Sequence, residues 1–154
     1  NLYNIANQNV QLFEGNVSGK NIHLVSEVEL NTEAYADKDM VDSVLRNLMS
    51  NAIKFTKSGG RIRISSKDQE AFVEIAVSDT GVGMSKEAME QLFRIDIPHT
   101  TRGTANELGT GLGLMLCKEM IEKNSGDIWI ESEEGKGSTF RFILPKEPKV
   151  PEVP

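Results

Sequence analysis

Residues 39–56 read DMVDSVLRNLMSNAIKFT, and their apolar spacing decides the fold. Apolar side chains recur at helical spacing and form one face of an amphipathic helix, at Val41, Leu45, Leu48, Ala52 and Phe55. A rotation of about 100° per residue places Asn47, Asn51 and Lys54 in one row beside that face. Asparagine is a poor helix former because its amide competes for backbone hydrogen bonds. Taken alone, the row is best interpreted as a solvated helix flank.

The composition predicts a single globular domain. The chain has 154 residues, of which 38% are hydrophobic and 26% are charged, so a folded core is expected. The net charge is −6 and the basic residues are scattered, which argues against nucleic-acid binding. An acidic chain can still bind phosphates locally, because loops and helix ends present backbone N–H groups.

The cysteine content and the absence of long apolar runs favour a reducing, aqueous compartment. Cys117 is the one cysteine, so no intramolecular disulfide can form, and we interpret it as a small buried hydrophobe. No run approaches the ~18 apolar residues of a membrane-spanning helix, and the first residues lack a signal-peptide pattern. We expect a cytoplasmic location. The chain starts without methionine, so it is interpreted as a fragment, and any membrane anchor is expected outside it.

Hydrophobic periodicity predicts helices and strands on both sides of the asparagine helix. The predicted elements are a helix over 5–19, a strand over 21–30, the helix over 39–55 capped by Asp37 or Asp39, a hairpin within 61–81, helices over 85–93 and 111–126, and strands over 127–132 and 137–145. Residues 94–110 have no sustained period and are predicted to be a functional loop. This order predicts an α/β sandwich in which helices cover one face of a mixed sheet. The domain is expected to span 1–145, and 146–154 to be a Pro-rich tail or linker.

Two glycine-rich stretches border predicted elements. SDTGVGM, over 78–84, places Asp79 at the end of a strand, followed by Gly81 and Gly83. These glycines indicate either a tight turn with positive φ or a wall where backbone approaches a ligand beside one carboxylate. GTGLGL, over 109–114, runs into a helix, where glycines let backbone amides reach phosphates at the positive helix end. Neither stretch fits the dinucleotide-binding pattern G-x-G-x-x-G.

The order of these stretches is more specific than any one of them. A helix with N-x-x-x-N-A-x-K precedes D-x-G-x-G after a strand, then a long loop, then G-x-G-x-G-L at a helix start. In this order the sequence strongly resembles the ATP-binding catalytic domain of sensor histidine kinases, in the GHKL superfamily. NLMSNAIKFT resembles the N box, DTGVGM the first glycine box, LF at 92–93 part of the F box, GTGLGL the second glycine box and GSTFRFILP the closing strand. The resemblance implies the Bergerat fold, a two-layer sandwich with a mostly antiparallel sheet of about five strands under three helices.

The resemblance also implies a Mg-ATP site with a role for each matching residue. Asn51, with Asn47 beside it, would contact Mg²⁺, and Lys54 would neutralise phosphate charge, so these three are the expected catalytic residues. Asp79 would accept a hydrogen bond from the exocyclic amine of adenine and repel the carbonyl of guanine. Phe55 and Leu114 would make apolar contacts with the nucleotide, and Thr139 would support Asp79 and the base through water. Residues 94–110 would be the ATP lid, with Arg102 as a cation that contacts phosphate. The other expected nucleotide contacts belong to the glycine boxes: Gly81, Gly83, Gly109, Thr110, Gly111, Leu112 and Gly113.

As a kinase module, the chain would donate the γ-phosphate of ATP to a histidine on a separate dimerisation domain, with a response-regulator receiver domain downstream. Such an acceptor is a histidine followed by an acid and a nearby proline, and neither His23 nor His99, which follows Pro98, matches this motif. The chain alone is therefore expected to bind ATP without phosphorylating itself. We expect a monomer without nucleic-acid binding and without direct membrane contact.

Two alternatives stay open. A related ATPase, as in gyrase, mismatch-repair and heat-shock chaperone proteins, would carry a glutamate in place of Asn47 to activate water. A non-catalytic signalling module would be expected to lose Asp79, Asn51 or the glycines, and all of these are present.

Overall fold

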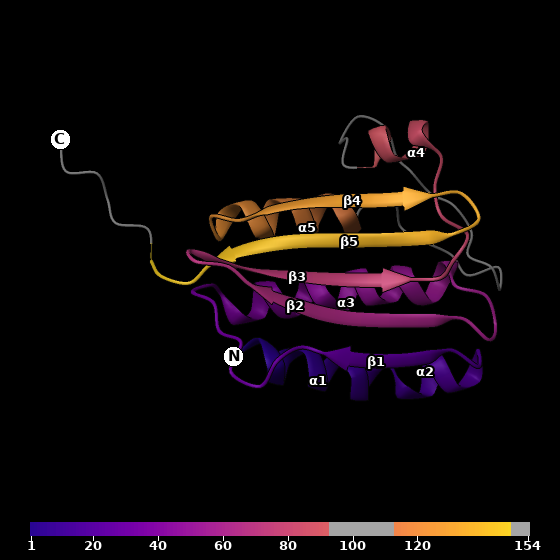
Figure 1. Cartoon of the computed structure of the whole chain (residues 1–154), viewed down its shortest axis with the longest axis horizontal. Coiled ribbons are helices and arrows are strands. Elements are labelled where there is room, and N and C mark those ends of the chain that lie inside the picture. Colours follow the sequence, from indigo (N-terminus) through magenta and orange to yellow (C-terminus); the bar gives the residue numbers. More distant parts are fainter. Residues whose placement is uncertain (93–112, 149–154) are drawn as a thin grey trace.

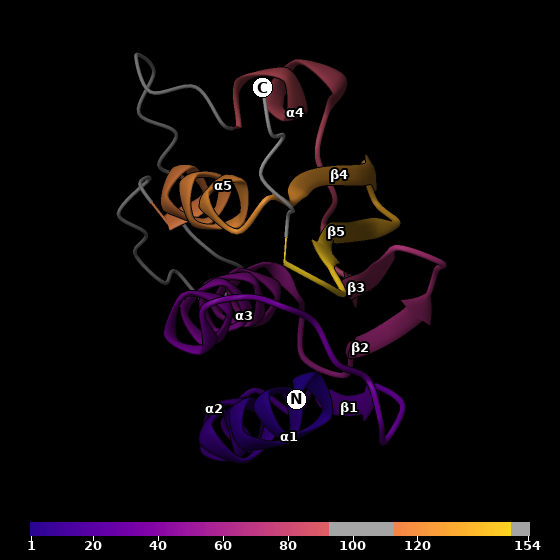
Figure 2. The same cartoon turned by 90° about the vertical axis from the view of Figure 1, so that its left-hand side faces the viewer.

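Five strands form one sheet, and helices are stacked on one of its faces (Figure 1 and Figure 2). The computed structural model describes residues 1–92 and 113–148. The strands are β1 (His23–Glu27), β2 (Arg61–Asp68), β3 (Phe72–Asp79), β4 (Asp127–Glu133) and β5 (Gly137–Pro145). The helices in these ranges are α1 (Leu2–Leu12), α2 (Glu14–Gly19), α3 (Lys38–Phe55), α4 (Lys86–Gln91) and α5 (Gly113–Lys123).

The sheet is mixed and mostly antiparallel, with the strand order β1-β2-β3-β5-β4. β1 pairs in parallel with β2, and α3 makes the crossover between them. The pairs β2–β3, β3–β5 and β4–β5 are antiparallel. Figure 2 shows α1, α3 and α5 side by side on one face, while α4 lies beyond β4. The predicted two-layer α/β sandwich is therefore confirmed.

Helix α3 supplies the centre of the core, as its apolar spacing predicts. Seven of its side chains are buried: Val41, Val44, Leu45, Leu48, Met49, Ala52 and Ile53. They belong to one hydrophobic cluster with buried strand residues that include Ile62, Ile75 and Phe142. Full burial of each large side chain contributes about 1.5–3 kcal/mol. The row of Asn47, Asn51 and Lys54 is half-buried, at the border of this core.

Both ends of α3 are fixed by side chains. Asp37 Oδ1 accepts a hydrogen bond from the N–H of Met40 at 3.0 Å, so Asp37, and not Asp39, is the cap. At the other end, Lys20 Nζ donates to the carbonyl oxygens of Ile53 and Lys54, at 2.8 and 3.1 Å. A cation at this position stabilises the negative end of the helix dipole. These contacts at the two ends of α3 therefore fix the position of the asparagine row along the helix axis.

The single helix predicted over 5–19 is wrong, because the structure has two helices that meet at Phe13. In a continuous helix Val17 would lie about 80° away from the buried Asn9. The break at Phe13 allows Val17 to be buried as well. The amide nitrogen of Asn9 donates to Asp42 on α3 at 2.8 Å and so ties α1 to the central helix.

Several element ends meet at one side of the molecule. In Figure 1 the end of α3, the end of β3 and the start of β5 all lie at the right-hand side. The N-terminus and the start of α1 lie towards the opposite side. The N box, the first glycine box and the start of the closing strand therefore lie at one end of the sheet.

None of the helices in the described ranges combines the length and apolarity needed to cross a lipid bilayer.

Candidate functional site

The end of α3 and the loop after β3 are joined through their backbones. The N–H of Val82 donates to the carbonyl oxygen of Phe55 at 3.1 Å. A Cβ on Gly81 would collide with this same oxygen and would lie 2.8 Å from Oδ1 of Asp79. Glycine is therefore the residue that fits at this position, and the DTGVG stretch lies directly on the end of the asparagine helix.

The turn between β4 and β5 holds the same loop from its other side. The N–H of Gly135 donates to the carbonyl of Val82 at 2.8 Å, and the N–H of Met84 donates to Ser132 Oγ at 2.8 Å. Gly83 has φ +70°, and a Cβ there would collide with the carbonyl oxygen of Glu133. The predicted positive-φ turn is therefore found at Gly83. The loop is fixed between α3 and the hairpin turn.

Asp79 ends β3 as a half-buried carboxylate. It follows the buried Ile75 and Val77 in the alternation of the strand, so its side chain lies on the helix-covered face. Its Oδ1 accepts from the N–H of Gly81 at 2.9 Å and from the N–H of Ser138 at 3.2 Å. Burial raises the pKa of Asp79, and these two bonds lower it by less. Such a carboxylate is typical of a binding site, because its charge is costly there without a partner.

The residue that supports Asp79 from β5 is Ser138, and the prediction of Thr139 is wrong by one position. Asp79 pairs with Ser138 in the β3–β5 register, and Ser78 pairs with Thr139. The Thr139 hydroxyl donates to Ser78 Oγ at 3.1 Å, on the opposite face of the sheet. Alternation could have indicated this, because Ser138 is in phase with the apolar residues at 140, 142 and 144.

Asn47 faces the start of α5. Its Oδ1 would lie 3.4 Å from a Cβ on Gly113, the first residue of that helix. Cys117 lies one turn further along α5, and its thiol contacts the carbonyl of Val44 at 3.9 Å. Burial raises the pKa of Cys117 to about 12, and a hydrogen bond from Asn47 lowers it by less. The prediction that Cys117 is a small buried hydrophobe is confirmed.

The remaining predicted residues fall into two groups. Asn51, Lys54, Phe55 and Leu114 are half-buried at the same end of the molecule, and the Lys54 ammonium lies 4.9 Å from the centre of the Phe55 ring. Several predicted contacts lie outside the described residues: Arg102, Gly109, Thr110, Gly111 and Leu112. Of the predicted F box, Leu92 is buried, and Phe93 lies outside the described range.

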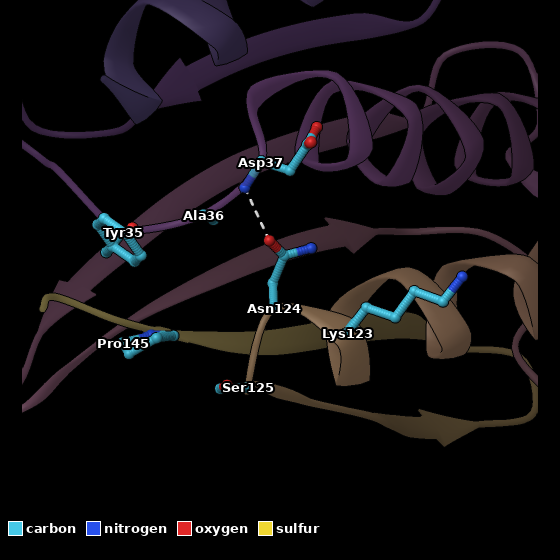
Figure 3. A pocket seen from close by; sticks show the side chains of 7 residues that line it. All are labelled: Tyr35, Ala36, Asp37, Lys123, Asn124, Ser125 and Pro145. Atoms are coloured by element: carbon cyan, nitrogen blue, oxygen red, sulfur yellow. Dashed lines mark hydrogen bonds between the residues drawn. The ribbon is translucent and has the colours of Figure 1, made fainter. Parts of the chain in front are cut away.

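A separate pocket lies at the other end of α3 (Figure 3). Its volume is about 380 Å³, and it is lined by Tyr35, Ala36, Asp37, Lys123, Asn124, Ser125 and Pro145. The N–H of Asp37 donates to the amide oxygen of Asn124 at 2.7 Å across it. It contains none of the motif residues, because it lies at the start of α3 and they lie at its end. The pocket is therefore separate from the candidate site.

The fold and the site define a nucleotide-binding domain of the ATPase class. Its features are a carboxylate at the end of a strand, a glycine loop hydrogen-bonded to a helix end and an asparagine that faces a helix start. Residues 36–148 match the sequence profile of the histidine kinase-, DNA gyrase B- and HSP90-like ATPase family. The chain belongs to this family. Within the family it is an ATP-binding catalytic domain of the sensor histidine kinase type.

Similar proteins and structures agree with this assignment. The sensor histidine kinase WalK of Bacillus subtilis is 40% identical over 115 residues, which are 71% of this chain and 18% of WalK. The catalytic domain of histidine kinase ThkA aligns with a TM-score of 0.81 and 34% identity, over 96% of both chains. ThkA in complex with the response regulator TrrA aligns with a TM-score of 0.77 and 30% identity, over 96% of this chain and 41% of that one. The chain thus spans about a fifth of the length of WalK.

Replacing Gly81 with alanine should loosen the loop from α3. We expect the free energy of unfolding to fall by about 1–3 kcal/mol, because the added Cβ collides with the Phe55 carbonyl. Gly15→Ala is the matched control, since a Cβ on Gly15 meets nothing within 4 Å. Urea titration of both variants measures the difference. Equal stability of the two variants would contradict the close packing of this loop.

The raised pKa of Asp79 predicts a pH-dependent stability difference. Protonated Asp79 makes a favourable contribution to the free energy of unfolding. This contribution is complete below the ordinary pKa of 3.8 and is lost as the pH rises through the raised pKa of the folded state. Asp79→Asn keeps an oxygen for the two N–H donors and carries no charge. We therefore expect Asp79→Asn to gain stability relative to the unmodified chain between pH 4 and pH 7, as measured by urea unfolding. A relative gain towards low pH would refute this.

Proposed function

We propose that this chain binds Mg-ATP and donates its γ-phosphate to a histidine on a separate dimerisation domain of the same kinase, in two-component signal transduction. The observation that carries the proposal is the half-buried carboxylate of Asp79 on a glycine loop locked to the asparagine helix. This arrangement would provide an acceptor for a base and donors for phosphates at one end of the fold.

Asp79 is proposed to read the adenine base. An ionised carboxylate accepts hydrogen bonds only, so it would bind the exocyclic amine of adenine and repel the carbonyl of guanine. Oδ1 already accepts two N–H bonds, so Oδ2 is the oxygen with capacity for the base. Phe55 and Leu114 would add apolar contact, with the backbone of Gly81 and Gly83 alongside.

Asn47, Asn51 and Lys54 are proposed to hold the phosphates and the metal. Amide oxygens are hard neutral ligands and suit a Mg²⁺ that keeps waters and phosphates as its other ligands. Asn47 Oδ1 lies near Gly113, at the positive end of α5, where anionic groups are favoured. The metal would neutralise charge on the transferred phosphoryl group. Lys54 would add positive charge on the same side.

The second glycine box and the lid complete the proposed phosphate site. The backbone of Gly109, Thr110, Gly111 and Leu112 would contact phosphates, as Gly113 would, and Arg102 would add a lid cation. We propose these roles from the motif order, since these residues before Gly113 lie outside the described part of the chain.

The amide at position 47 favours phosphoryl transfer over hydrolysis. An acceptor imidazole has its own nucleophilic nitrogen, which bonds to the γ-phosphorus while the bond to the bridging oxygen breaks and ADP leaves. No base has to remove a proton from such an acceptor before attack. Hydrolysis would need a carboxylate or another base to activate water, and the amide of Asn47 cannot accept that proton. Catalysis would then rest on position and electrostatics.

The partners are proposed from the histidine kinase relatives. A solved complex of ThkA with a response regulator supports a receiver domain as the downstream partner. His23 is exposed at the start of β1, and His99 lies outside the described residues. Neither has an acceptor motif, so the acceptor would be on another domain. We propose that the domain is cytoplasmic and monomeric. Its proposed bounds are 1–145, because β5 ends at Pro145, with the tail over 146–154.

Calorimetric titration with ATP and GTP in the presence of Mg²⁺ tests the nucleotide site. We expect ATP to bind and GTP to give no binding, because the Asp79 carboxylate repels the guanine carbonyl. Asp79→Asn should weaken ATP binding by at least about tenfold, through loss of a charge-assisted hydrogen bond. If the folded chain binds neither nucleotide, the non-catalytic alternative replaces the proposal.

Phosphoryl transfer from radiolabelled ATP tests the reaction. The isolated chain should stay unlabelled, and a supplied histidine-bearing dimerisation domain of its own kinase should become labelled on histidine. Removal of Mg²⁺ by a chelator should abolish labelling, and Asn51→Ala should reduce it by about tenfold or more through loss of a metal contact. Stable phosphohistidine on the isolated chain would disprove the separate acceptor, and steady release of phosphate without labelling would favour the ATPase alternative.

A further inference from the structure

Three groups of the candidate site converge on the hydroxyl of Ser132, a β4 residue that sequence reasoning missed. The N–H of Met84 donates to Ser132 Oγ at 2.8 Å. Ser132 Oγ donates to the carbonyl oxygen of Gly137 at 2.9 Å. The third contact, at 2.7 Å, is with the hydroxyl of Ser138. One side chain thereby connects the glycine loop, the hairpin turn and the strand beside Asp79.

The hydrogen-bonding capacity of a hydroxyl settles the direction of the third bond. A serine hydroxyl has one proton to donate and two lone pairs that accept. The carbonyl of Gly137 can only accept, so it takes the proton of Ser132, and the N–H of Met84 occupies one lone pair. The remaining lone pair must accept from Ser138, which is therefore the donor in the bond between the two hydroxyls.

This direction fixes what Ser138 can offer to a ligand. Its only hydroxyl proton is committed to Ser132, so its oxygen retains acceptor capacity alone. Ser138 is 7% exposed, and its backbone N–H donates to Oδ1 of Asp79 at 3.2 Å. Asp79, when ionised, is also an acceptor. The base end of the site is thus lined by two acceptors side by side.

We propose that Ser132 is a positioning residue for the recognition of adenine, acting through Ser138 and through the loop that begins at Asp79. This inference rests on the proposed binding of ATP. Two acceptors suit the exocyclic amine of adenine, directly or through one water, and disfavour the carbonyl that replaces the amine in hypoxanthine. Loss of the Ser132 hydroxyl would free the proton of Ser138, which could then donate to that carbonyl.

Titration of ATP and inosine triphosphate into the Ser132→Ala variant tests the proposal. ATP affinity should fall by about tenfold, with a smaller fall or a gain for inosine triphosphate, so that the ratio of the two affinities decreases. Ser132→Thr, which retains the hydroxyl, should restore the ratio. Ser132→Cys, which nearly retains the volume but hydrogen-bonds weakly, should reproduce the change if the alanine variant does not fold.

Ser78→Ala is the matched control, because it removes a hydroxyl partner at 3.1 Å on the opposite face of the same sheet. It should leave the ratio of affinities unchanged. Equal weakening of both nucleotides by Ser132→Ala and Ser132→Cys would overturn the proposal and leave Ser132 a structural role only. Failure of the unmodified folded chain to bind ATP would overturn the proposed function as well, so the two failures are distinguished by the unmodified chain.

Discussion

The contact between Gly81 and the last turn of α3 is the constraint on which the site depends. The backbone of the loop lies so close to the Phe55 carbonyl that a Cβ has no room, and the Val82 N–H is bonded to the same oxygen. This contact fixes the chain that leaves Asp79, and the β4–β5 turn fixes it again from the other side through Gly135. The carboxylate therefore has a rigid position before any ligand binds, which reduces the ordering cost of binding.

Helix α3 connects the stability of the core to the geometry of the site. Its apolar face includes Leu48, which is fully buried, while the neighbouring row presents Asn47 and Asn51 at the core border. A tightly packed helix cannot rotate about its axis without disturbing the packing of its apolar face. The core therefore holds the asparagine row of α3 in place. Lys20 and Asp37 fix the two ends of the same helix. The proposed metal contacts thus depend on the hydrophobic core for their orientation.

Asp79 and Asn47 show how polar groups in the site trade stability against function. Burial disfavours the charge of Asp79, and a neutral amide there would suit the fold better at neutral pH. In the proposed function, the charge would give selectivity for a base that donates hydrogen bonds. Position 47, by contrast, has a neutral amide in place of the base that hydrolysis would need. Under the proposed function, the two residues together would bind ATP and leave its γ-phosphate for transfer to another acceptor.

Local sequence determined the α3 helix and its asparagine row and narrowed the cap to Asp37 or Asp39, because helical periodicity and capping depend on residues close in the chain. It also indicated the motif order that assigns the family. The tertiary structure alone decided that Ser138 is hydrogen-bonded to Asp79 and that Ser132 is hydrogen-bonded to Ser138, because both contacts depend on how β3, β5 and β4 pair. Register comes from packing between distant segments, and a shift of one residue moves every side chain to the other face.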